Sequence, residues 1–406
     1  MLTRRGRLTL ALGGGTYLAA WAFGAQVLYA PAVGLVLAVA GAAIWTSAVA
    51  RPFRLHRQID RDRPVEGDDV VLRLELESSG STVPGSAILR MSAGKLGERE
   101  IPMLREGRFL RAIFRLPRVP RGRYRFTDAE AVIEDPFGLA RRVQPFGDSG
   151  AVLVYPRLAR LTDLFAERGL RSHGAGRILL RRPAGFELHS VREYQSGESL
   201  RRVHWPSTAR RQRLMVKELE DAPRDEIAVV IDAQAGHGAG LPPDSSFDAQ
   251  VRAAGSILWA HARRARHVRL VITSGSDADS VSIRSYDRDW PRALEVLASA
   301  EQTGRRPVEA ALSDPSGAPA HARDLAVVTA ALRPPLVETL IARAAAQQQV
   351  SVVYVDAPSF AGRPAALGSD ATVLRLQRAG IAVAVLRKGD DLEGVLGSAE
   401  AGAAHG

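Results

Sequence analysis

The N-terminal part of the chain carries a long run of residues without charge. No charged residue occurs over residues 8–50, and this run is about twice the ~20 residues that one membrane-spanning helix needs. Tyr29, Ala30 and Pro31 lie at its middle, where proline favours the start of a new helix over continuation of the old one. The pattern therefore predicts a transmembrane hairpin over residues 1–51, with spans at 8–28 and 31–49.

Basic residues flank both predicted spans, and the short turn between the spans carries none. The flanking residues are Arg4, Arg5, Arg7, Arg51, Arg54, His56 and Arg57. By the positive-inside rule, both ends lie in the cytoplasm, which predicts a cell-membrane protein with cytoplasmic soluble domains. A cleavable signal peptide ending near Ala20-Trp21-Ala22 is the alternative for the first span, and it leaves this localisation unchanged.

Small residues recur every four positions in both predicted spans. One stripe contains Ala11, Gly15 and Ala19, and the other contains Gly34, Ala38 and Ala42. Such stripes allow helices to approach closely in lipid. They predict that the two helices pack through these residues.

Residues 52–156 alternate between apolar and polar positions over short runs. In the clearest run, Leu72, Leu74 and Leu76 alternate with charged residues, which is typical of a half-buried strand. Further runs cover 87–91, 109–116 and 129–134, with turn-forming residues between them. The pattern predicts a β-rich, sandwich-like domain that acts as an adaptor or spacer.

Residues 226–400 alternate between apolar strands and helices with 3.6-residue periodicity, and residues 401–406 form a tail. The expected strands cover 227–232, 267–273, 325–329, 350–356 and 381–386, and 281–286 is expected to add an antiparallel edge strand. The order predicts an α/β doubly wound domain with a parallel sheet. Asp232 ends the first strand, where it could meet a ligand or cap the following turn.

Between these regions, the connecting segment 157–225 contains the densest set of cationic and aromatic side chains. Six arginines stand beside Tyr194 and Trp205; these are Arg192, Arg201, Arg202, Arg210, Arg211 and Arg213. Arginine beside aromatic rings suits phosphate, nucleic acid or carboxylate partners. The alternative is an internal network in which the arginines pair with Glu193 and Glu198 while Trp205 fills a core.

The net charge of +11 also requires an acidic partner or a broadly solvated basic surface. The absence of cysteine excludes disulfides, thiolate metal sites and a cysteine nucleophile. No Walker A, GxGxxG, GxSxG or HExxH pattern occurs in the sequence. The residues therefore predict no catalytic site, no cofactor and no enzyme activity.

The connecting segment resembles the signature of the domain of unknown function 58 family. The resemblance runs through Arg192, Glu193, Tyr194, Gly197, Glu198, Arg201, Arg202, Trp205 and Arg210. The order of regions is also similar, including an Asp-Pro-Phe-Gly-Leu turn over residues 135–139. This resemblance implies that residues 226–400 adopt a von Willebrand factor A-like fold. Domains of that type often bind a cation through Asp-x-Ser-x-Ser, but here only Asp232 remains, so no metal site is expected.

The resemblance further implies a MoxR-type AAA+ ATPase as partner. The leading hypothesis is therefore a non-enzymatic, membrane-anchored interaction or scaffold protein whose arginine-rich segment docks that ATPase. The alternative is binding of anionic lipid headgroups or nucleic acid through the same arginines. The membrane anchor argues against nucleic acid.

Overall fold

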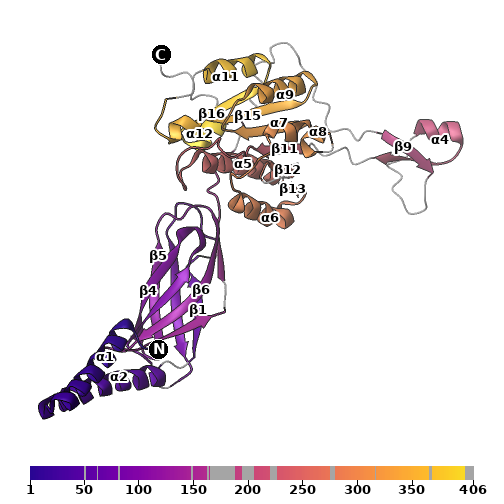
Figure 1. Cartoon of the computed structure of the whole chain (residues 1–406). Helices are drawn as coiled ribbons and strands as arrows, with labels where there is room; N and C mark the ends of the chain where they lie inside the picture. Colours follow the sequence, from indigo (N-terminus) through magenta and orange to yellow (C-terminus); the bar gives the residue numbers. More distant parts are fainter. Residues whose placement is uncertain are drawn as a thin grey trace. The chain divides into compact units, whose positions relative to one another are not determined.

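The computed structural model describes residues 1–49, 52–61, 63–80, 83–147, 150–161, 164, 188–193, 205–219, 226–274, 279–315, 317–364 and 368–397. The chain divides into two compact units, Met1–Tyr155 and Pro156–Gly406 (Figure 1). The first unit holds the N-terminal helices together with an antiparallel sheet. The second holds the connecting segment and the α/β domain.

The N-terminal helices are α1 (Arg4–Phe23) and α2 (Tyr29–Val49), joined by the 3₁₀ turn η1 (Gln26–Leu28). Within the described residues, one stretch, Gln26–Val49, is long and apolar enough to span a membrane or to act as a signal sequence, with a mean hydropathy of 2.2. The prediction of two spans is wrong. Helix α1 begins at Arg4 and ends at Phe23, before the left-handed C-cap Gly24, so its uncharged part is shorter than the ~20 residues of a span.

The two helices pack only partly through the predicted stripes, since Ala42 is buried but the two stripe glycines are not in the contact. A Cβ on Gly13 would lie 3.1 Å from Cβ of Leu35, which places Gly13 in the helix contact. A Cβ on Gly15 or Gly34 would have no neighbour within 4 Å. The predicted stripes are therefore wrong at these two glycines.

An eight-stranded antiparallel sheet makes up the rest of the first unit. The strands are β1 (Phe53–Ile59), β2 (Val70–Ser78), β3 (Ser86–Ser92), β4 (Glu98–Glu106), β5 (Phe109–Leu116), β6 (Gly122–Glu134), β7 (Arg141–Phe146) and β8 (Gly150–Val154). Their order is β1-β2-β5-β4-β3-β6-β7, and β8 also pairs with β6. The four strands expected in this region are confirmed.

The predicted two-sheet sandwich is replaced by one curled sheet. Strand β6 is long enough to pair with β8 along its first half and with β3 and β7 along its second half. A register shift on β3 and the positive φ of 53° at Asp128 on β6 accompany this curl. Alternate side chains, such as Leu72, Leu74 and Leu76 on β2, fill a single core.

The α/β domain contains a six-stranded, mostly parallel sheet. Its strands are β11 (Glu226–Ile231), β12 (His267–Ile272), β13 (Asp279–Ile283), β14 (Asp324–Thr329), β15 (Gln349–Val355) and β16 (Ala382–Leu386), in the order β13-β12-β11-β14-β15-β16. Only the edge strand β13 is antiparallel, as the sequence predicts. The expected alternation of strands and helices is confirmed.

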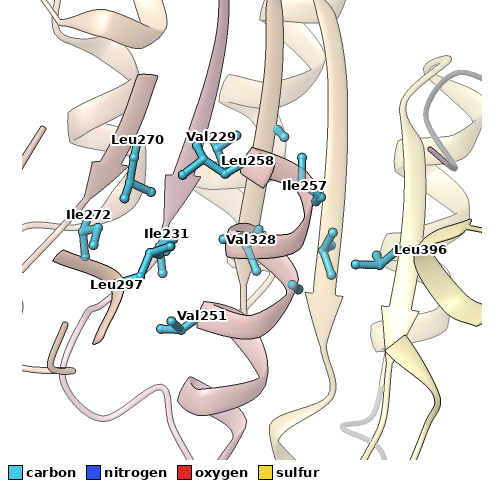
Figure 2. Packing of buried hydrophobic residues seen from close by; sticks show 14 of the residues in the cluster. Val229, Ile231, Val251, Ile257, Leu258, Leu270, Ile272, Leu297, Val328 and Leu396 are labelled. Atoms are coloured by element: carbon cyan, nitrogen blue, oxygen red, sulfur yellow. The ribbon is translucent and has the colours of Figure 1, made fainter. Parts of the chain in front are cut away.

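Helices cover both faces of this sheet. They are α5 (Ser246–Arg263), α6 (Tyr286–Ser299), α7 (Val308–Ser313), α8 (Ala318–His321), α9 (Pro334–Ala345), α10 (Ala357–Phe360), α11 (Ser369–Arg378) and α12 (Leu392–Gly397). Helices α5, α6, α10 and α12 pack on one face of the sheet and form one hydrophobic core with it. Leu258, Leu297 and Leu396 of this core are seen in Figure 2. The other core packs α7, α8, α9 and α11 on the opposite face. The carboxyl ends of the parallel strands remain at one edge, where ligands bind in such sheets.

Candidate functional site

The described part of the arginine-rich segment forms a small β-hairpin with a helix between its strands. The elements are β9 (Leu188–Glu193), α4 (Trp205–Arg211) and β10 (Met215–Leu219). The strands are antiparallel, with Arg192 opposite Val216 and Glu193 opposite Met215. The predicted site residues Arg192 and Glu193 therefore lie on β9, while Trp205 and Arg210 lie at the two ends of α4.

Helix α4 is fixed to β10 by a local contact. The backbone N–H of Met215 donates a 3.0 Å hydrogen bond to Oγ1 of Thr208. The Met215 side chain is buried, 4 % exposed. The hydrogen bond from Met215 to Thr208 thus holds the helix next to the strand.

Trp205 is 68 % exposed at the start of α4. The alternative in which this ring fills a core is therefore wrong. Arg210 and Arg211 are exposed in the last turn of the same helix. Tryptophan and arginine are the residues most enriched among the side chains that dominate binding energy at protein interfaces. The arrangement can bind a protein surface that is acidic or that has a pocket for an aromatic ring. We refer to Trp205, Arg210 and Arg211 as the α4 surface.

The other predicted signature residues are Tyr194, Gly197, Glu198, Arg201 and Arg202. All five lie outside the described residues. The structure therefore brings together Trp205 and Arg210 on one helix, and places Arg192 and Glu193 on a strand of the same hairpin.

Asp232 lies at the carboxyl edge of the α/β sheet, directly after β11, and is completely buried. Its Oδ2 accepts a 2.8 Å hydrogen bond from the hydroxyl of Thr329 at the end of β14. The same oxygen lies 3.1 Å from Nδ1 of His237, and Oδ1 accepts a 3.1 Å bond from the backbone N–H of Gln234. Both carboxylate oxygens are thus engaged by the protein, with the geometry of a turn residue.

Further contacts close the loop after β11. Thr273 Oγ1 accepts a 2.9 Å hydrogen bond from the backbone of Ala233. Arg333 donates to Oε1 of Gln234 at 3.1 Å and to both carboxylate oxygens of Glu309 at 2.8 and 3.0 Å. At the carboxyl ends of the parallel strands, a connected network of hydrogen bonds therefore ties together the loops after β11, β12 and β14.

The sequence did not identify His237 or Arg333 as members of this network. His237 follows Asp232 by five residues within a glycine-rich loop, and this short spacing is the pattern that could have indicated their contact. Arg333 stands at the N-cap of α9, about a hundred positions further along, and no local pattern links it to Asp232. Among the described residues, no group of three or more His, Cys, Asp or Glu side chains is arranged to hold a metal ion.

A second acid, Asp356, lies at the same edge after β15 and is 2 % exposed. Its Oδ2 is 3.7 Å from Nε of Arg387. Burial, reinforced by the charges of Asp356 and Asp370, raises the pKa of Tyr354 above its ordinary value. This part of the edge thus keeps a neutral phenol beside a paired carboxylate.

Comparison with known proteins finds a family match over part of the connecting segment and much of the α/β domain. Residues 190–361 match the family model described as protein of unknown function DUF58. The uncharacterized protein YeaD of Bacillus subtilis (strain 168) is 25% identical over 220 residues. That match covers 54% of this chain and 53% of YeaD, so the chain spans about half the length of this relative.

Among solved structures, Cwp6 from Clostridium difficile aligns with 81% of this chain and 45% of its own, at 9% identity and a TM-score of 0.16. The α4 surface and the Asp232 network both lie within the residues that match the family model.

Proposed function

We propose that the protein, whose residues 190–361 belong to the DUF58 family of proteins of unknown function, is a non-enzymatic, membrane-anchored interaction module. Its partner is an acidic protein surface, and the candidate is a MoxR-type AAA+ ATPase. The α4 surface makes the contact, and the protein acts as a scaffold in complex assembly.

The observation that carries this proposal is the 68 % exposure of Trp205. A tryptophan ring contributes a large apolar area, and an exposed tryptophan is among the side chains that most often anchor a partner. Arg210 and Arg211 on the same helix supply positive charge beside the ring. Such charges steer an acidic partner towards the surface and fix its orientation.

The Asp232 network supports a structural role for the sheet edge. Both oxygens of Asp232 accept hydrogen bonds from within the domain. We propose that the α/β domain is von Willebrand factor A-like, with an antiparallel edge strand and a central first strand. In this domain Asp232 holds the loops instead of a cation.

We propose that α2 anchors the protein in the cell membrane and that the soluble regions lie in the cytoplasm. Basic residues follow α2, namely Arg51, Arg54, His56 and Arg57. Their position predicts that the end of α2 next to the sheet is cytoplasmic.

The test is affinity purification of the full-length protein from detergent-solubilised membranes, with and without ATP. The wild-type chain is compared with the triple variant Trp205→Ala/Arg210→Glu/Arg211→Glu. The control is Arg375→Glu/Arg378→Glu, which reverses two exposed arginines in the last turn of another helix, α11. The two variants carry the same change in charge.

The proposal expects the ATPase with the wild-type chain and with the control, and its loss with the triple variant. Equal recovery with a folded triple variant would show that the α4 surface is not the docking site. Recovery of nucleic acid instead, with affinity that falls steeply with salt, would favour a nucleic-acid-binding function.

A further inference from the structure

The 135–140 turn, which follows β6, is built around the carboxylate of Asp135. Its Oδ2 accepts a 2.9 Å hydrogen bond from the backbone of Phe137, and its Oδ1 accepts a short bond of 2.5 Å from the backbone of Ala140. Gly138 has a φ of +67° and donates its N–H to the carbonyl oxygen of Asp135. The turn is therefore rigid, and its shape does not depend on the side chain at 137.

The N-terminus of the chain is attached to this turn. The backbone N–H of Thr3 donates to the carbonyl of Leu139 at 2.9 Å, and the Thr3 hydroxyl donates to the carbonyl of Gly138 at 2.6 Å. The backbone N–H of Gly6 in turn donates to Oγ1 of Thr3, which is the N-cap of α1. The start of α1 is thereby fixed against the 135–140 turn.

The end of α2 is attached to the same part of the sheet. The first residue of β1, Phe53, donates its N–H to Oε1 of Gln144 on β7 and accepts a bond from Nε2, both at 3.0 Å. Strand β7 directly follows the 135–140 turn. The turn therefore lies at the end of the helix pair where α2 joins the sheet.

Exposed apolar and basic side chains gather at this place. Phe137 is 77 % exposed at the tip of the turn. The exposed arginines around it are Arg4, Arg5, Arg7, Arg141 and Arg142. Arg5 lies beside the turn, because a Cβ on Gly138 would be 4.0 Å from its Nη1. The acids nearby are Asp135, which is used within the turn, and Glu134, which pairs in register with Arg141.

We infer that the 135–140 turn is a membrane-contact element whose ligand is the surface of an anionic phospholipid bilayer. Phe137 enters the interfacial region, and the surrounding arginines contact lipid phosphates. Aromatic side chains favour the headgroup level of a bilayer, and basic residues next to a membrane helix are attracted to anionic lipids. We assign a lipid ligand because the turn lies at the end of the apolar helix α2. Strand β7 follows the turn, and its Gln144 is bonded to Phe53, at the start of β1 after α2.

This inference rests on the proposed anchoring of α2 in a membrane. If α2 lies in a bilayer, a rigid turn at its sheet end is held at the level of the headgroups. The exposed ring of Phe137 then has a defined environment, and the turn sets how closely the sheet approaches the membrane.

The absence of cysteine allows a direct test, because each introduced cysteine carries the only spin label in the chain. Full-length Phe137→Cys, Leu37→Cys and Glu98→Cys proteins are labelled and reconstituted into phosphatidylcholine vesicles containing phosphatidylglycerol. Leu37 is 64 % exposed on α2 and reports on the anchor. Glu98 is exposed and pairs with Ser92 on β3, and Ser92 pairs with Thr127 on β6. Thr127 lies about 25 Å along β6 from the turn. The measurement is the collision rate of each label with lipid-dissolved oxygen and with a water-soluble nickel complex.

We expect the label at 137 to favour oxygen over nickel and the label at 98 to favour nickel. In vesicles of phosphatidylcholine alone, the reading at 137 should shift towards water, and an unchanged reading would overturn the part assigned to anionic lipid. A label at 37 in lipid together with a water-exposed label at 137 overturns this inference and leaves the anchor intact. Labels at both 37 and 137 in water overturn the anchor and the inference together.

Discussion

The hydroxyl of Thr329 donates a 2.8 Å hydrogen bond to Oδ2 of Asp232, which joins the ends of two neighbouring parallel strands, β14 and β11. Both side chains are completely buried. A buried carboxylate is costly unless hydrogen-bond donors surround it. The pair therefore holds the carboxyl edge of the sheet in one arrangement.

Replacing Thr329 by valine should lower the free energy of unfolding of the α/β domain by about 2 kcal/mol. Valine has nearly the same shape, so the loss comes from removing the donor to a buried carboxylate together with the acceptor of the 3.0 Å bond from the backbone N–H of Ala331. The measurement is chemical denaturation of the full-length protein in detergent, followed by tryptophan fluorescence. The control is Thr339→Val, which removes a hydroxyl bond to Pro335 on the surface of α9 and should change stability by less than about 0.5 kcal/mol. Equal losses in the two variants would contradict the role of the Asp232 bond.

Substituting Gly6 by alanine should release the start of α1 from the sheet. An added Cβ would lie 2.0 Å from the carbonyl oxygen of Leu139, and this backbone atom cannot move aside without disturbing the turn. The expected loss is about 1–3 kcal/mol, as for other overpacked sites. The measurement is the thermal midpoint in detergent, together with protease cleavage near the N-terminus.

The matched control for this substitution is Gly14→Ala in the same helix. A Cβ on Gly14 would have no neighbour within 4 Å. Because alanine favours a helix over glycine by roughly 0.5–1 kcal/mol, this variant should be neutral or slightly more stable. A destabilised Gly14→Ala protein and an unaffected Gly6→Ala protein would refute the docking of α1 on Leu139.

Much of the fold could be predicted from local patterns. The strand expected over residues 109–116 coincides with β5 (Phe109–Leu116), because alternation and turn residues mark its two ends. The curl of the sheet could not be predicted, since it depends on which distant strands pair along β6. The first predicted span, over residues 8–28, failed for a local reason: the helix there, α1, includes Arg4, Arg5 and Arg7 and ends at Phe23.

The candidate site shows the same division. The place of Asp232 at the end of a strand followed from the sequence. Its partner Thr329 is 97 residues away, so the contact depends on the parallel pairing of β11 and β14. The exposure of Trp205 could not be predicted either, because an aromatic residue among arginines suits both a binding surface and a core.

Trp205→Ala should leave the stability of the protein almost unchanged, within about 0.5 kcal/mol, because the ring is mostly in water. Trp290→Ala is the contrasting variant. Trp290, on α6, is 8 % exposed in the core and stacks on Tyr286 of the same helix with ring centroids 5.8 Å apart. Its loss should cost about 3–5 kcal/mol. Denaturation midpoints of the two variants test this contrast, and a large loss for Trp205→Ala would mean that its ring supports the fold and not a partner.

The stability of the α/β domain should fall as the pH decreases below neutrality, because of His261. This side chain is 4 % exposed near the end of α5, and its Nδ1 lies 3.1 Å from Nη1 of Arg266. Burial, followed by the charges of Arg266 and Arg264, lowers the pKa of His261 from 6.5 to about 3. The folded state therefore keeps the ring neutral at pH values where the unfolded state binds a proton.

Since the unfolded chain binds the extra proton between about pH 6.5 and pH 3, the contribution of His261 is fully present above this window and is lost as the pH falls through it. Between pH 7.5 and pH 5 the loss should be about 2 kcal/mol. His261→Gln keeps an acceptor for Arg266 but cannot titrate, so its free energy of unfolding should change less over this range. His321→Gln, at an exposed position, should keep the wild-type pH dependence. If denaturant titrations at the two pH values give the same dependence for all three proteins, then His261 is not the neutral buried base that its surroundings indicate.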